Sequence, residues 1–214
     1  MKNSKLRRIL LTLACAVLLV SLSVGATLAY LTSKTDPVQN TFTVGNVAIT
    51  LDEAKVDEYG VPVEGAERVM KNTYKLIPKA TYTKDPIVYV SDNSEDCWIF
   101  VKVYNGLKTE FSGMADIETT IEEKTIAAQM TANDWICVDS VNNIWGYHQV
   151  VSENTSWPVF ETFTLNDTAT QEQLEAIVDG GTCYIYIQAF AIQAEGLTTL
   201  TAAWDAAQFN GWAF

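Results

Sequence analysis

The chain opens with a long uncharged run that follows a basic start. Four basic residues precede position 9, residues 9–24 carry no charge, and small residues predominate at 25–29. A basic start, an apolar middle and a small-residue exit are the three parts of a secretory signal peptide. The apolar run is shorter than the ~20 residues of a membrane-spanning helix. The pattern predicts a signal peptide over residues 1–29, cleaved between Ala29 and Tyr30 with Ala26 as second choice, and no stable membrane span after cleavage.

Beyond position 40, apolar and polar residues alternate in short runs rich in β-branched and aromatic side chains. This pattern is typical of half-buried β-strands. It predicts strands at residues 42–51, 87–90, 97–104, 135–138, 146–151, 159–165 and 182–194. Turn residues separate the second strand from the third, so we expect these two to form a hairpin. The longest run, 182–194, is expected to be a central strand.

Apolar residues at helical spacing appear in three short stretches, at residues 114–130, 170–178 and 199–209. Two glycines follow the second of these, as at a helix end. Residues 52–75 are polar and contain glycine and proline, which favours a loop or an irregular hairpin. The order of elements predicts an all-β fold: a jelly-roll-like β-sandwich with short peripheral helices, after the signal peptide.

The predicted mature chain has 185 residues, which suits one domain, and it carries 10 basic and 26 acidic residues. Its net charge of −16 repels phosphate backbones and anionic membranes, so we expect no nucleic-acid partner. We expect three parts: a cleaved signal peptide (1–29), an N-terminal segment (30–44) and a single sandwich domain (45–214).

The sequence contains little that points to catalysis. His148 is the only histidine, and the His-Glu-x-x-His, Gly-x-Ser-x-Gly and phosphate-loop motifs are absent from the sequence. The oxygen-rich residues 92–96 are more typical of a turn than of a calcium site. We therefore expect no catalytic residues, no metal site and no cofactor. Cys97, Cys137 and Cys183 cannot all pair internally, and whether they are buried thiols or include one disulfide stays open.

Three sets of motifs carry a resemblance to a known family. Residues 26–33 (ATLAYLTS) followed by 40–47 (NTFTVGNV) resemble the signal exit and first strand of proteins processed by the SipW type of signal peptidase. That group includes the TasA and camelysin (CalY) family of biofilm-matrix fibre proteins. Further similarity to the group lies in 84–86 (KDP) with 94–103 (SEDCWIFVKV), and in 191–196 (AIQAEG) with 203–204 (AW).

The resemblance implies a secreted jelly-roll subunit of Gram-positive bacteria that polymerises by donor-strand exchange after cleavage by a type I signal peptidase of the SipW kind. The candidate donor strand is then residues 30–44, in which Leu31, Val38, Phe42 and Val44 supply apolar side chains. Pro37 lacks a backbone N–H, so pairing is expected from Val38 onward. A second interpretation stays open, in which residues 42–51 form the first strand of the monomer's own sheet.

We therefore expect a secreted, non-enzymatic structural subunit of an extracellular or biofilm matrix, whose partners are further copies of itself and the signal peptidase. Two other functions are retained. The first is a monomeric cell-surface adhesive or ligand-binding module. The second is a camelysin-like metallopeptidase, which the resemblance also brings and which the single His148 disfavours.

Overall fold

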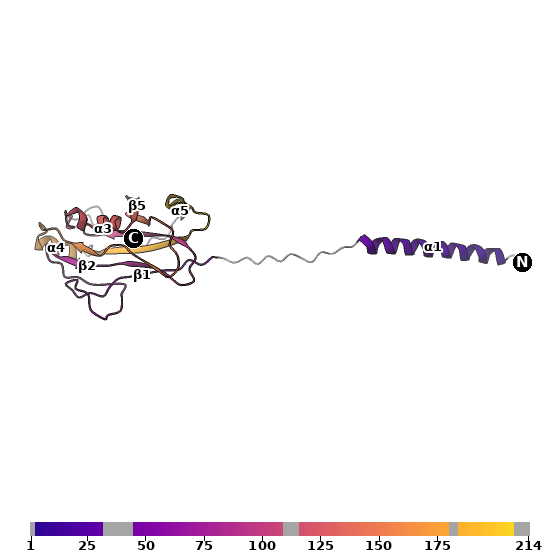
Figure 1. Ribbon diagram of the computed structural model, residues 1–214, viewed down its shortest axis with the longest axis horizontal. Helices are drawn as coiled ribbons and strands as arrows, with labels where there is room; N and C mark the ends of the chain where they lie inside the picture. Colours follow the sequence, from indigo (N-terminus) through magenta and orange to yellow (C-terminus); the bar gives the residue numbers. More distant parts are fainter. Residues whose placement is uncertain (1–2, 32–44, 109–115, 180–183, 208–214) are drawn as a thin grey trace. The chain divides into compact units, whose positions relative to one another are not determined.

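The computed structural model describes residues 3–31, 45–108, 116–179 and 184–207 (Figure 1). The chain divides into two compact units, Met1–Thr43 and Val44–Phe214. In the first unit a single helix, α1, spans Asn3–Leu31. Within the described ranges, no helix combines the length and the apolarity that crossing a membrane requires.

The second unit is built from antiparallel sheets with a few short helices, so the expected mainly-β fold is confirmed. One sheet has the order β1 (Ile49–Asp52), β3 (Ile87–Val90) and β7 (Thr155–Pro158). Another pairs β2 (Thr81–Thr83) with β8 (Thr162–Thr164). The largest has the order β5 (Trp135–Asp139), β6 (Ile144–Tyr147), β4 (Cys97–Asn105) and β9 (Ile185–Gln193).

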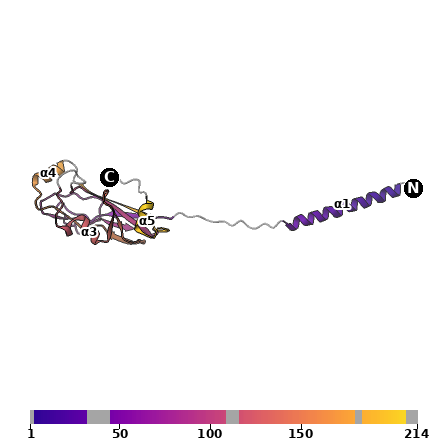
Figure 2. The ribbon, with the colours of Figure 1, turned by 90° about the horizontal axis from the view of Figure 1, so that it is seen from above.

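The helices lie at the periphery of these sheets. They are η1 (Glu122–Lys124, a 3₁₀ turn), α3 (Ile126–Ala132), α4 (Gln171–Asp179) and α5 (Leu200–Ala207). Two views agree that α4 lies at one end of the second unit and α5 towards the other (Figures 1 and 2). The helices predicted at 170–178 and 199–209 are confirmed in α4 and α5, the latter as far as the described residues reach.

Of the helix predicted at 114–130, only the part from Ile126 onward is found, as α3, while 114 and 115 lie outside the described residues. Thr125 caps α3, where its hydroxyl oxygen accepts a hydrogen bond from the backbone N–H of Ala128. Upstream the chain is extended instead, because the backbone N–H of Ile117 bonds the carbonyl of Leu107 and Glu118 forms a bridge with Leu165. Tertiary pairing thus overrides the helical spacing of the apolar residues there.

Strand β4 is buried on both of its faces. Its side chains at Cys97, Ile99, Val101 and Val103 enter the main core between the sheets. Trp98 and Phe100 point to the opposite face, where Ala203 of α5 packs against them. This explains why the run from 97 to 103 is almost continuously apolar: a strand covered on both sides keeps little polar alternation.

Two expectations about strand neighbours are wrong. Strands β3 and β4 do not form a hairpin, because β3 pairs with β1 and β7 while β4 pairs with β6 and β9. Between them, Ser94 accepts a hydrogen bond from the N–H of Ala48, and the N–H of Glu95 bonds the carbonyl of Asn46. These bonds direct the chain from one sheet to the other.

The run at 182–194 is not a central strand, because β9 lies at the end of its sheet among the described residues. Its apolar side chains are only partly buried, packed on the margin of the core. Strands β6 and β8 are shorter than the predicted 146–151 and 159–165, and β6 begins two residues earlier. Strand β1 covers only 49–51 of the predicted 42–51, of which 42–44 lie outside the described residues.

Candidate strand-acceptor edge

Three of the six residues predicted for cleavage and donation lie outside the described part of the chain. Ala29 and Tyr30 lie in the last turn of α1, and Leu31 is its final residue. Val38, Phe42 and Val44 lie outside the described residues. The structure therefore describes the surface to which a donor strand would bind, rather than the donor strand itself.

On one side of β9, the backbone groups have no strand partner among the described residues. Beyond its two ends, the N–H of Gly106 bonds the carbonyl of Tyr184 at 2.8 Å, and the N–H of Ala194 bonds the carbonyl of Asp96 at 2.8 Å. Because hydrogen-bonded and non-hydrogen-bonded pairs alternate in an antiparallel ladder, the even-numbered residues of β9 bond to β4. The backbone groups of its odd-numbered residues therefore point away from β4.

The same odd-numbered residues direct apolar side chains towards the core. Ile185, Ile187, Ala189 and Ala191 pack against the main cluster yet stay partly exposed. We call these four residues the acceptor edge. It combines outward-facing backbone N–H and C=O groups with half-covered apolar side chains, which are the two features that an added strand requires.

A second sheet margin lies beside the acceptor edge. The Cα atoms of β1 and β9 come within 8 Å of each other, although the two strands belong to different sheets (Figure 1). In β1 the even-numbered residues bond to β3, since the N–H of Ser91 bonds the carbonyl of Ala48. Ile49 and Leu51 are only partly buried. The two sheet margins therefore lie close together, and both carry apolar side chains that are only partly buried.

The opposite margin of the large sheet, β5, is better protected against pairing. Its register with β6 shifts between Cys137 and Asp139, as at a β-bulge. The carboxylate of Asp139 accepts hydrogen bonds from the N–H groups of Val141 and Asn142, and the amide side chain of Asn142 also donates to it. These bonds lower the pKa of Asp139. Bulges and charges are common protections of edge strands, and β9 carries neither a bulge nor a charged residue.

A cavity of about 450 Å³ opens at the Ile185 end of β9. Its apolar and aromatic lining includes Tyr74, Leu76, Leu107, Phe163, Tyr184 and Ile185. The ring of Tyr74 meets that of Phe163 edge-on at 5.1 Å. At the surface, Tyr184 and Tyr186 stack with ring centroids 5.0 Å apart, each 46% exposed. Charged and polar residues complete the lining, namely Glu53, Lys71, Asn72, Thr73 and Lys84. The acceptor edge thus leads into a hollow with both apolar and polar walls.

A polar network anchors the long loop that follows β1 and forms one wall of the cavity. The buried ammonium of Lys84 pairs with the buried carboxylate of Glu53, whose other oxygen accepts a hydrogen bond from Asn72 at 3.1 Å. Nearer the surface, Arg68 joins Asp52 at 2.5 Å and Asp85 at 3.0 Å. These contacts fix the loop on the sheets, so the cavity wall is a defined surface.

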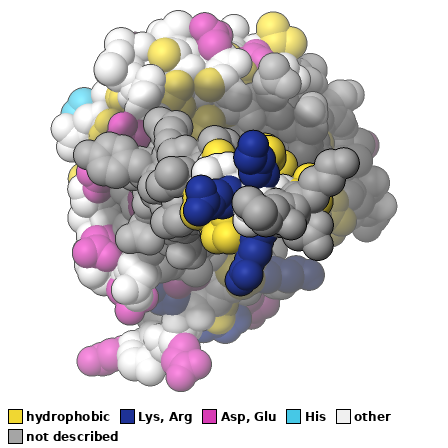
Figure 3. All heavy atoms as spheres, turned by 90° about the vertical axis from the view of Figure 1, so that its right-hand side faces the viewer, with side chains coloured by type: hydrophobic (Ala, Val, Ile, Leu, Met, Phe, Trp, Pro, Cys, Tyr) yellow, Lys and Arg dark blue, Asp and Glu magenta, His cyan; other side chains and the backbone are white. Residues whose placement is uncertain are grey.

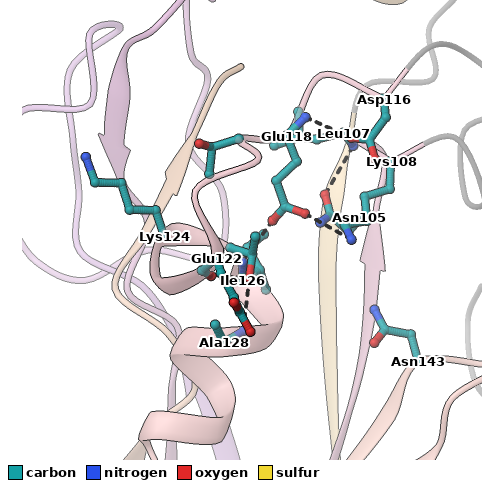
Figure 4. A network of polar contacts seen from close by, with 12 residues as sticks. Asn105, Leu107, Lys108, Asp116, Glu118, Glu122, Lys124, Ile126, Ala128 and Asn143 are labelled. Carbon is teal, nitrogen blue, oxygen red and sulfur yellow. Dashed lines mark hydrogen bonds and ion pairs between the residues drawn. The ribbon is translucent and has the colours of Figure 1, made fainter. Parts of the chain in front are cut away.

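A second buried carboxylate belongs to Glu118 (Figure 4). The side chain of Glu118 is 1% exposed, and one of its oxygens accepts the N–H of Ile126 at 2.9 Å. The other lies 3.6 Å from the ammonium of Lys108 and has no hydrogen-bond partner in the part of the chain that the structure describes. Burial raises the pKa of Glu118, although the Ile126 N–H, Lys108 and Asn105 oppose the rise. Its ionised form is therefore disfavoured by the fold.

This arrangement predicts a pH-dependent difference between wild type and Glu118→Gln. A folded-state pKa above the unfolded value means that Glu118 favours folding at acid pH and loses that contribution as pH rises through its folded-state pKa. Each pKa unit of difference corresponds to about 1.4 kcal/mol. In urea unfolding at pH 4 and pH 8, we expect Glu118→Gln to gain stability relative to wild type as pH rises. Glu122→Gln, at an exposed position of η1, is the control; equal behaviour of both variants would contradict the prediction.

His148 and the cysteines show no shared site among the described residues. His148 is exposed, with its ring 4.8 Å from that of Tyr147. No group of three His, Cys, Asp or Glu side chains arranged to hold a metal occurs in the ranges that the structure describes. Cys97 is buried, which raises the pKa of its thiol to about 11, whereas Cys137 is exposed; both are free. Cys183 lies outside the described residues.

Sequence reasoning identified the long apolar strand at 182–194 but missed its edge position, the cavity beside it and the buried Glu53–Lys84 pair. No local signal in the sequence indicates these features, because each depends on which segments pack together. Comparison of the chain with protein-family models, with curated proteins and with solved structures found no match.

Proposed function

We propose that this chain is a secreted, non-enzymatic structural subunit of an extracellular or biofilm matrix, similar to the TasA and camelysin family, with a jelly-roll β-sandwich as its body. Cleavage after Ala29 frees residues 30–44 of one copy, which then pair with the acceptor edge of the next. The observation that carries the proposal is the open acceptor edge, where backbone groups of Ile185–Ala191 face outward beside half-buried apolar side chains.

Strand addition suits the chemistry of both partners. Main-chain hydrogen bonds supply affinity, and alternate side chains supply specificity. The segment 30–44 offers Val38, Phe42 and Val44 at even positions, with mainly polar residues between them. An exposed strand without a bulge or a charge is prone to pairing with another chain, so β9 is the expected partner rather than β5.

The distribution of charge supports a subunit that stays soluble until it assembles. The basic side chains of α1, Lys5, Arg7 and Arg8, gather at its N-terminal end and leave with the signal peptide, whereas acidic side chains are scattered over the rest of the visible surface (Figure 3). The resulting charge of −16 opposes non-specific aggregation. Specific backbone pairing then has to overcome this repulsion, so assembly is expected to strengthen with salt.

Deletion of residues 30–38 from the mature chain tests the proposal. We expect fibres of the full mature chain in negative-stain microscopy and only soluble, folded monomers of the deletion variant, because the donor has lost Val38 and the length to span β9. A variant with residues 30–38 replaced by nine Gly and Ser residues controls for length. Fibres of the deletion variant at wild-type concentration would overturn the proposal.

A ligand-binding module is the second candidate, because the cavity of about 450 Å³ has the size of a small-molecule site and exposed tyrosines at its rim. Under that function, the mature chain stays monomeric at high concentration and deletion of residues 30–38 changes nothing. The same microscopy therefore separates the two candidates.

A further inference from the structure

We propose that the donor segment runs antiparallel to β9 of the next copy, placing Phe42 and Val44 at the cavity and generating an open head-to-tail fibre. This inference rests on the proposed function, strand addition. It adds the direction of the donor strand, its register against β9 and the donor side chains that occupy the cavity.

The spacing of apolar positions favours one register. Val38, Phe42 and Val44 share one face of an extended segment, because side chains alternate along a strand. The span from 38 to 44 equals the span of the acceptor edge from 185 to 191. Antiparallel pairing over this span sets Val44 beside Ile185, Phe42 beside Ile187 and Val38 beside Ala191. All three apolar side chains then face the seam.

The direction follows from where the chain enters its own folded unit. A Cβ added to Gly45 would lie 2.5 Å from Oε2 of Glu95 and 2.9 Å from Oε1 of Gln193. The chain therefore joins the unit at the Gln193 end of β9, whereas the cavity lies at the Ile185 end, next to Val178 of α4. The chain thus enters its own folded unit at one end of β9, and the cavity lies at the other end.

Only the antiparallel direction gives each folded unit its own space. In parallel pairing, Val44 of the donor would lie beside Ala191, where the acceptor's own Gly45 already packs against Gln193. Two chains and two folded units would then compete for one end of β9. In antiparallel pairing, the donor's unit follows beyond Ile185, at the end marked by α4 (Figure 1). Repetition of this heterologous contact produces an open filament.

The cavity matches the largest side chain among the donor residues 38–44, which pair with the acceptor edge. Its volume of about 450 Å³ and its lining of Leu76, Leu107 and Phe163 suit an aromatic ring, whose burial removes about 150–250 Å² from water. Phe42 is the only aromatic residue between positions 31 and 44. With Phe42 beside Ile187 and Val44 beside Ile185, both side chains lie at the cavity end of the acceptor edge.

Disulfide trapping in the mature chain tests direction and register. In a Cys137→Ser, Cys183→Ser background, one variant carries Val44→Cys with Ile185→Cys, and a matched variant carries Val44→Cys with Ala191→Cys. After assembly and mild oxidation, non-reducing gels should show a ladder of covalent multimers at least tenfold stronger for the first pair. Circular dichroism of each variant checks that it is folded.

The outcomes separate this inference from the proposed function. A ladder for the Ala191 pair instead, with fibres present, overturns the antiparallel direction and leaves strand addition standing. Fibres with no ladder for either pair overturn docking on the acceptor edge. Absence of fibres from the background protein itself contradicts the proposed function, and the inference with it.

Substitution of the donor tests the occupant of the cavity without disturbing the folded unit. Phe42→Ala should raise the critical concentration for fibre formation at least tenfold, because it removes the ring that fills the cavity. Thr43→Ala, on the opposite face of the donor, should change it less than threefold. Equal effects of the two substitutions would overturn the assignment of Phe42 to the cavity.

Discussion

A mature chain carrying Ala189→Pro is expected to fold normally and to form no fibres at concentrations at which the wild type polymerises. The backbone N–H of Ala189 points away from β4, so proline removes no bond of the ladder within the subunit. It deletes a donor at the middle of the acceptor edge and places a ring where the added strand must approach. We expect the critical concentration, measured by sedimentation, to rise at least about tenfold, which corresponds to 1.4 kcal/mol.

The matched control places proline at the other margin of the same sheet. Cys137 lies on β5, is exposed, and has its backbone directed away from β6, because the N–H of His148 bonds the carbonyl of Asp134 and the ladder alternates. Cys137→Pro should leave fibres intact. Fibres of Ala189→Pro at the wild-type concentration would show that β9 is not the acceptor strand. Loss of fibres in both variants would contradict the prediction that only the β9 edge, and not the β5 edge, is needed for assembly.

Replacement of Lys84 by methionine is expected to destabilise the folded unit by about 3–5 kcal/mol, because it leaves the buried carboxylate of Glu53 without its cation. The side chains of Lys84 and Glu53 are 9% and 7% exposed, so the carboxylate would be left largely desolvated and without its cation. Urea unfolding followed by tryptophan fluorescence measures the loss. The double variant Glu53→Leu with Lys84→Met should recover most of it, since no buried charge remains.

Arg68→Met provides the comparison within the same network. Arg68 also joins two strand regions through Asp52 and Asp85, but the three side chains are 26–31% exposed, and such pairs contribute about 1 kcal/mol or less. The structure shows the Glu53–Lys84 pair as buried. If Lys84→Met lowers the free energy of unfolding no more than Arg68→Met does, this buried state of the pair is contradicted. Because this network holds one wall of the cavity, Lys84→Met should also weaken fibre formation more than Arg68→Met does.

Local features of the chain were well predicted from the sequence. The run of β-branched and aromatic residues at 97–104 predicted β4, and the helical spacing of apolar residues at 170–178 predicted α4. Both patterns depend on neighbours within a few residues, since side-chain direction repeats every two residues in a strand and about every 3.6 in a helix. The polar stretch after β1 was likewise predicted to lack regular structure.

Predictions that depended on distant partners failed. The turn residues 91–94 favoured a hairpin of β3 and β4, yet the bonds of Ser94 and Glu95 with residues 46–48 send these strands into different sheets. The apolar character of 182–194 favoured a central strand, yet β9 pairs with β4 alone among the described residues. A strongly apolar run shows that side chains will be covered, but it does not distinguish cover by the chain itself from cover by another copy.

The sequence by itself therefore determined the β-class of the folded unit and the positions of several of its strands and short helices. Only the tertiary structure decided that β9 is an edge, that its odd-numbered backbone groups face outward, and that a cavity lies at its Ile185 end. The physical reason is that side-chain alternation is encoded within a strand, whereas strand order is set by packing between segments up to a hundred residues apart. The surface available to a neighbouring copy is what remains after that packing is complete.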